Sequence, residues 1–169
     1  MLPGRPQPSQ KRFDTLVWQC LRSFDPARPV YVESESRKVG NLAVPEALIA
    51  AMRQSPCLRL ELPDDERVAL LLEDYEFFVD DRDLFCRRLD ALVELRGKAT
   101  VQAWKDQVHA GNFNTVVREL LSVHYDPGYE RSIRNNFVRY ANALTVTAGN
   151  RSMAEMDRLA EALLRAQGA

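Results

Sequence analysis

The spacing of apolar residues near the start of the chain predicts one helix and one strand. Residues 1–8 hold three prolines and a glycine, which predict an extended lead-in. Between residues 13 and 24, apolar side chains recur every three or four positions, and Ser9 is placed to cap the resulting amphipathic helix. Residues 29–34 are mostly apolar and predict a strand.

The following segment repeats this order of elements. Pro45 opens a helix over residues 45–55, because a proline at the first helical position loses no hydrogen bond. Residues 57–62 alternate and predict a second strand, and Pro63 opens a helix over 63–79. The order helix, strand, helix, strand, helix favours an α/β fold with a parallel or mixed sheet flanked by helices.

Beyond residue 80 the pattern becomes mainly helical. The predicted elements are helices over 82–95, 100–111 and 114–125, a partly helical stretch over 126–140, a returning strand over 142–147 and a last helix over 154–166. Ser152 and Glu155 have the spacing of a capping box for that last helix. Trp18 and Trp104 lie on apolar helix faces, which predicts core positions for both.

The composition is typical of a globular protein and argues against several classes of protein. The chain has 169 residues, is 46% hydrophobic and 28% charged, and carries a formal charge of −1, so no overall basic field indicates nucleic acid. Neither a signal peptide nor an apolar run of roughly 20 residues is present, which predicts a cytoplasmic protein with no membrane partner. Cys20, Cys57 and Cys86 are too scattered for a structural zinc site and predict buried free thiols.

The first candidate site lies where the predicted strand 29–34 ends. Glu33 and Glu35 share one face of such a strand, and Arg37 and Lys38 follow at once. Ligands of open α/β sheets bind beyond the carboxyl ends of the strands, where acids suit a Mg²⁺ shell and bases suit phosphate oxygens. A solvated strand end with local ion pairs explains the same residues equally well.

The second candidate site is a cluster of aromatic and basic residues around a predicted Pro-Gly turn. Its members are His124, Tyr125, Tyr129 and Arg131. Aromatic rings interleaved with arginines can stack on unpaired bases and hold an RNA backbone. The alternative is a helix end whose aromatic rings pack on the core, with His124 as a hydrogen-bonded structural residue.

Taken together, these stretches resemble one family, the bacterial tRNA 2-selenouridine synthases. The matching stretches are "PGRPQPSQKRFD" (3–14), "PVYVESESRKVGNLAVPEAL" (29–48), "ERVALLLEDY" (66–75) and "HYDPGYERS" (124–132). Complete members begin with a rhodanese-like domain that carries the catalytic cysteine, followed by a P-loop motif. This chain resembles the C-terminal half, because it contains neither G-x-x-x-x-G-K-[ST] nor a position matching that cysteine.

The resemblance implies an incomplete P-loop NTPase-like sheet flanked by helices, with a helical segment after residue 80. The implied domain covers residues 9–169, divided into an α/β portion (9–80), a mainly helical portion (81–140), and a returning strand with the C-terminal helix (141–169). Its first strand and P-loop are expected to lie in another segment. The predicted sheet then has an exposed edge that invites pairing with a separate N-terminal half or with a second copy.

The resemblance also implies a selenotransferase acting on tRNA. The family replaces the sulfur of wobble 2-thiouridine by selenium through a geranylated intermediate, using geranyl diphosphate and selenophosphate. The implied roles are polarising carboxylates for Glu33 and Glu35 with Mg²⁺ as a candidate metal, phosphate binding for Arg37 and Lys38, and contact with the tRNA anticodon region for His124, Tyr125, Tyr129 and Arg131. No nucleophile is identified, so the chain alone is expected to be inactive. The rival hypothesis is a stand-alone RNA-binding or partner-binding module without catalysis.

Overall fold

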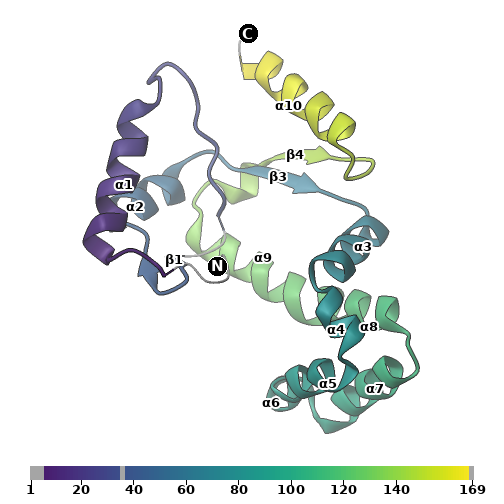
Figure 1. Cartoon of the computed structure of the whole chain (residues 1–169). Helices are drawn as coiled ribbons and strands as arrows, with labels where there is room; N and C mark the ends of the chain where they lie inside the picture. The colour runs from purple at the N-terminus through teal and green to yellow at the C-terminus, as the bar shows by residue number, and fades with distance from the viewer. Residues whose placement is uncertain (1–5, 35–36, 168–169) are drawn as a thin grey trace. The chain divides into compact units, whose positions relative to one another are not determined.

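The protein is mixed α/β and mostly helical, and it forms two compact units. The computed structural model describes residues 6–34 and 37–167 (Figure 1). The first unit comprises Met1–Cys57 and Ser132–Ala143, and the second comprises Leu58–Arg131 and Leu144–Ala169. Within the described ranges, none of the helices is both long and apolar enough to cross a membrane.

The first unit opens with the predicted amphipathic helix, α1 (Gln10–Ser23). Ser9 caps it as predicted, and its hydroxyl accepts a hydrogen bond from the backbone N–H of Arg12 at 3.3 Å. No residue of α1 is buried, however, and Trp18 is 56% exposed, so the predicted core position of Trp18 is wrong. Periodicity identifies the apolar face of a helix but not whether another element covers it.

The predicted strand over residues 29–34 is also wrong. These residues belong to no strand, and Val30, Tyr31 and Val32 are exposed. A strand needs a neighbour for its backbone hydrogen bonds, and none of the described strands pairs with this segment. A short antiparallel hairpin follows instead, β1 (Lys38–Val39) and β2 (Leu42–Ala43), with Gly40 at φ 61° in its turn.

Two glutamines, one in the lead-in and one at the start of α1, hold this hairpin in place. The amide of Gln7 donates to the carbonyl of Val39 (2.6 Å) and accepts from the N–H of Asn41 (2.9 Å). Gln10 makes the same pair of bonds with the carbonyl and N–H of Ala43, at 2.8 and 2.9 Å. A side-chain amide can both donate and accept, so these two residues substitute for a neighbouring strand. This gives residues 7–10 of the matching stretch a structural role.

The second unit contains the two predicted strands that are confirmed, β3 (Leu58–Glu61) and β4 (Leu144–Thr147). They form a two-stranded parallel sheet in which Leu58 pairs with Leu144 and Leu60 with Val146. These four apolar side chains share one face of the sheet, because side chains of a strand alternate. All but Val146 are exposed, so the apolar face is largely uncovered by the described residues.

The helical character predicted beyond residue 80 is confirmed. The helices of the second unit are α3 (Asp64–Asp74), α4 (Glu76–Asp80), α5 (Arg82–Asp90), α6 (Val93–Arg96), α7 (Lys98–His109), α8 (Phe113–Glu119), the π-helical η1 (Leu120–Tyr125), the first residues of α9 (Asp126–Asn136), and α10 (Met153–Gln167). Their core contains Trp104 and Cys86, both buried as predicted. Cys20 is exposed and Cys57 half-buried, contrary to prediction, and all three thiols are free.

The predicted Pro-Gly turn at residues 127–128 is helical instead. The chain passes from η1 directly into α9, and the N–H of Asp126 bonds to the carbonyl of Leu121, five residues earlier. A proline inside an α-helix removes one i→i−4 hydrogen bond and clashes with the preceding turn. The wider π-helical turn makes room for Pro127, which explains why the helix continues through it.

The predicted capping box of α10 is half formed. The hydroxyl of Ser152 accepts from the N–H of Glu155 at 3.3 Å, as expected. The Glu155 carboxylate does not return to Ser152 but accepts from the N–H of Gly149 (2.9 Å) and from Arg158 (2.7 Å). Hydrogen bonds from Arg158 first, and then from the Gly149 N–H, lower the pKa of Glu155 to about 2. The carboxylate therefore fastens the loop after β4 to the start of α10.

Candidate functional site

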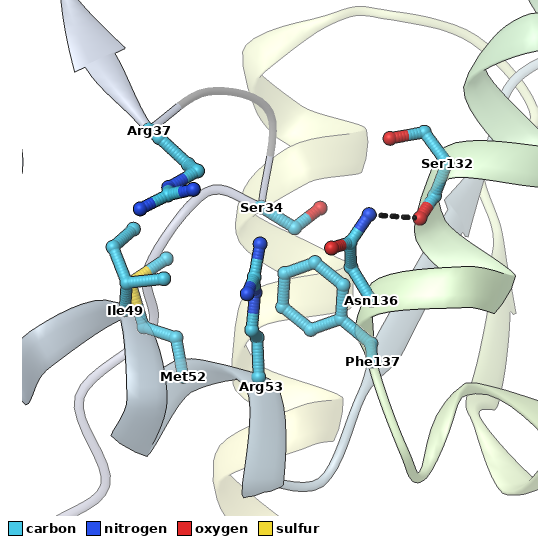
Figure 2. A pocket seen from close by; sticks show the side chains of 8 residues that line it. All are labelled: Ser34, Arg37, Ile49, Met52, Arg53, Ser132, Asn136 and Phe137. Carbon is cyan, nitrogen blue, oxygen red and sulfur yellow. Dashed lines mark hydrogen bonds between the residues drawn. The ribbon is translucent and has the colours of Figure 1, made fainter. Parts of the chain in front are cut away.

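A cavity of about 270 Å³ lies in the first unit, beside the segment that was predicted to bind phosphate. Its lining side chains are Ser34, Arg37, Ile49, Met52, Arg53, Ser132, Asn136 and Phe137. Figure 2 shows that they come from three places: the segment around residues 34–37, α2 (Glu46–Gln54), and the end of α9 with the residue after it. The cavity therefore combines two arginines and three small polar side chains with an apolar wall.

The backbone beneath Arg53 is fixed by a contact between α2 and the chain after α9. The N–H of Val138 donates to the carbonyl of Arg53 at 3.0 Å, and Ile49, one turn earlier on α2, is buried. The Arg53 side chain is half-buried, and none of the described residues forms an ion pair or hydrogen bond with its guanidinium. Asn136 donates one N–H to the carbonyl of Ser132 (2.8 Å), which orients its amide beside the cavity.

Arg37 is the one predicted phosphate residue that lines this cavity. Its guanidinium lies 3.0 Å from the Glu46 carboxylate, and the two side chains are 61% and 79% exposed. A pair this exposed stabilises the protein by at most about 1 kcal/mol, so Glu46 restrains Arg37 only weakly. Lys38 is an exposed residue of β1 and does not line the cavity.

Of the two predicted carboxylates, the structure describes only Glu33. Glu33 is exposed and is not among the lining residues, and Glu35 lies outside the described residues. In the described part of the chain, no three acidic, histidine or cysteine residues are close enough to hold a metal ion. The described residues therefore do not provide a set of ligands that fits Mg²⁺.

The second predicted site forms an aromatic face on the second unit. Tyr125 ends η1 and Tyr129 lies one turn later on α9, and their rings are stacked with centroids 5.6 Å apart and planes 13° apart. The two tyrosines are 46% and 38% exposed, so they do not pack into the core as the alternative interpretation required. An exposed, stacked pair of rings is the surface that an unpaired base can extend.

An ion pair that the sequence analysis missed holds this aromatic face to α3. Both oxygens of Asp126, the residue after Tyr125, accept hydrogen bonds from the Arg67 guanidinium at 2.5 and 3.0 Å. The bond to Asp126 is the largest cause that raises the pKa of Arg67, and both side chains are partly shielded from water. This bidentate pair joins the stretch 66–75 to the stretch 124–132, two of the four that carry the family resemblance.

The other two residues of the predicted RNA site are placed differently. A guanidinium nitrogen of Arg96 lies 3.3 Å from Nδ1 of His124. An arginine can only donate, so Nδ1 is the acceptor if this contact is a hydrogen bond. Arg131 follows Tyr129 by two positions and therefore lies about 200° around α9, on the opposite side from the tyrosine rings. The structure brings only Tyr125 and Tyr129 together.

Comparisons with known proteins first define a class and then a family. The chain matches a family model over residues 3–91, just over half of its length, and that model describes an AAA domain. The model is that of the tRNA 2-selenouridine synthase AAA domain, and the chain belongs to this family. Residues Glu33 to Lys38 lie inside the matched range, whereas the aromatic face lies outside it.

Two curated relatives carry the same name. The tRNA 2-selenouridine synthase of Marinobacter nauticus is 40% identical over 72 residues, which are 41% of this chain and 20% of the relative. The tRNA 2-selenouridine synthase of Cupriavidus necator is 41% identical over 71 residues, covering 41% of this chain and 19% of that protein. The matched part of the chain thus spans about a fifth of each relative's length. No solved structure matches the chain.

Proposed function

We propose that this chain supplies tRNA and phosphate contacts within a tRNA 2-selenouridine synthase. The observation that carries the proposal is the exposed Tyr125–Tyr129 stack, which the Arg67–Asp126 pair fixes to α3 in a protein of this family. The rings would stack on unpaired bases of the anticodon region, and Arg37 with Lys38 would bind phosphate groups. His124 holds Arg96 and so supports the aromatic face, while Arg131 would contact the RNA backbone from the other side of α9.

The reaction of the whole enzyme is part of the same proposal. It exchanges the sulfur of wobble 2-thiouridine for selenium by way of a geranylated intermediate, with geranyl diphosphate and selenophosphate as substrates. The described residues offer binding groups for such anionic substrates but no group placed as a nucleophile. The cysteine closest to a possible base is Cys86, 3.6 Å from His109, and burial raises the pKa of its thiol, which opposes thiolate formation. The proposed role of this chain is therefore binding.

The test of RNA binding replaces the stacked rings. We expect Tyr125→Ala with Tyr129→Ala to weaken binding of a 2-thiouridine-containing anticodon stem-loop by about tenfold or more, because each stacked base contributes about 1–3 kcal/mol. Fluorescence anisotropy at several salt concentrations measures the affinity, and the salt slope separates stacking from phosphate contacts. Tyr31→Ala removes a somewhat more exposed tyrosine of the other unit and is the control. Equal affinities for wild type, double variant and control would rule out the aromatic face as the RNA site.

We further propose that a second copy of this chain covers the exposed apolar face of the β3–β4 sheet. A two-stranded sheet is marginally stable alone, and the exposed Leu58, Leu60 and Leu144 offer an apolar surface for docking. We expect the chain to form dimers or larger species at tens of micromolar in sedimentation equilibrium, and Leu60→Lys to make it monomeric. The control is Leu95→Lys, at a more exposed leucine away from the sheet. A wild-type chain that stays monomeric at all concentrations would contradict self-association.

A further inference from the structure

We propose that the cavity of the first unit binds a small phosphorylated ligand, with Arg53 as its principal phosphate contact and Arg37 as the second. The organic part of the ligand would lie against Ile49, Met52 and Phe137. The inference rests on the phosphate role proposed for Arg37. It extends that role to residues outside the acidic and basic run from Glu33 to Lys38. It also assigns the site to a small molecule instead of RNA.

Arg53 carries the argument because its charge is otherwise uncompensated by described residues. Arg53 as a residue is half-buried and lines the cavity wall, where water screens its charge less than at an open surface. Arginines in such positions are normally paired, because burying a charge without a partner is unfavourable. Figure 2 shows the Arg53 side chain extending from α2 toward Ser34, with the Asn136 amide beside it. An oxyanion in this place would receive the planar donor fork of Arg53 and the remaining N–H of Asn136.

Arg37 can turn to the same ligand at little cost. Its present partner, Glu46, is mostly solvated, so a phosphate that exchanges for the carboxylate replaces a weak, screened contact. Phosphate offers more acceptor oxygens than a carboxylate and a larger negative charge, both of which favour arginine. The two arginines approach the cavity from different elements, α2 and the segment before β1, and can therefore hold different oxygens of one phosphate group.

The helix dipoles oppose anion binding in this cavity, but their effect is smaller than that of the two arginines. Arg53 and Asn136 lie in the last turns of α2 and α9, and each helix C-terminus carries about half a unit of negative charge. That effect falls off within one turn, and the carbonyl of Arg53 is already bonded to the N–H of Val138. The guanidinium ends at the tip of a long side chain that points away from the α2 backbone in Figure 2. Two full positive charges near the ligand therefore outweigh the dipoles.

The shape of the cavity decides between a small molecule and an RNA backbone. Backbone phosphates are bound by arginines that project from an open surface, with no need of an apolar wall. Here Ile49 is buried and Met52 and Phe137 are half-buried beside the two arginines, in a hollow of about 270 Å³. Small-molecule sites combine this apolar lining with a few convergent polar groups. The cavity fits a phosphate group together with a compact apolar substituent.

The test measures calorimetric binding of phenyl phosphate and inorganic phosphate to the full chain. We expect phenyl phosphate to bind more tightly than inorganic phosphate, and Arg53→Gln to weaken phenyl phosphate binding by about tenfold or more. Arg53→Lys, which keeps the charge but not the fork, should lose an intermediate amount. Met52→Gln should weaken the binding of phenyl phosphate and leave the binding of inorganic phosphate unchanged. The matched control is Arg12→Gln, which removes an exposed arginine of α1 in the same unit and should change affinity less than twofold.

Three results would overturn the inference. The first is no binding of either phosphate by the wild-type chain, and the second is equal weakening by Arg53→Gln and Arg12→Gln. The third is weaker binding of the anticodon stem-loop in Arg53→Gln without any binding of phenyl phosphate, which would assign these arginines to the RNA backbone. That third result would leave the proposed RNA-binding function standing. Conversely, Arg53→Gln could abolish phenyl phosphate binding and leave RNA affinity unchanged. That result would support the inference even if the tyrosine variants did not change RNA affinity.

Discussion

Replacing Trp104 with alanine is expected to lower the free energy of unfolding of the second unit by about 3–5 kcal/mol. Trp104 is 2% exposed and lies in the cluster formed by α5, α7 and α8. Its indole N–H donates to the Glu119 carboxylate at 2.6 Å. Alanine leaves a cavity where the indole was, and it also removes the hydrogen bond to Glu119, an exposed residue whose carboxylate water can solvate instead. The cavity, which is the larger of the two effects, opens within the hydrophobic cluster of this unit.

Urea unfolding followed by circular dichroism measures this change, and the second tryptophan provides the control. Trp18→Ala removes the same side chain from α1, where it is 56% exposed, and should cost less than about 1 kcal/mol. Trp104→Phe separates the two contributions in large part, because it removes the hydrogen bond but keeps most of the buried volume. If Trp104→Ala and Trp18→Ala cost the same, the helical cluster would not be the core of the second unit.

The contrast between these two tryptophans shows what the periodicity of the sequence could establish. Both lie on apolar helix faces, and the helices around both were predicted, since helix formation depends on residues close in sequence. Burial depends on a second element that covers the face. For Trp104 that element is α8, next along the chain, whereas no described residues bury the face of α1. The strand predicted over residues 29–34 was wrong for the same reason, because a strand needs a neighbouring strand to pair with.

The candidate sites were predictable to the extent that their residues are neighbours in the chain. Arg37 was identified from the acidic and basic run in which it stands, and Tyr125 and Tyr129 from one short cluster. Arg53 gave no such signal, because an arginine in the last turn of a helix is equally explained by the helix dipole. Its role appears only when α2 and the end of α9 are brought together. Contacts between residues that are far apart in the chain cannot be predicted from the spacing of residues in the sequence.

The Arg67–Asp126 pair is the clearest example, and its removal is the second large effect that we expect. The two residues are 59 positions apart, and each oxygen of Asp126 accepts a hydrogen bond from the Arg67 guanidinium. Asp126→Asn leaves the partly buried guanidinium with Asp64 alone as a charged partner, at the longer distance of 3.4 Å. Breaking a fully buried pair costs about 3–5 kcal/mol and breaking an exposed one about 0–1, so this half-shielded pair should cost about 1–3 kcal/mol. The same change should weaken binding of the anticodon stem-loop, because Tyr125 adjoins Asp126 and loses its anchor to α3.

A matched control and a double variant distinguish anchoring from a general loss of charge. Asp65→Asn breaks an ion pair between α3 and Arg118 that is more exposed, and should change the free energy of unfolding by less than about 1 kcal/mol. Arg67→Met combined with Asp126→Leu removes both charges together and should recover much of the stability, since no guanidinium remains unpaired. RNA affinity should stay low in that double variant if the bidentate geometry orients the tyrosines. Recovery of RNA affinity together with stability would mean that the pair serves folding alone, and that the aromatic face is positioned by η1 and α9 themselves.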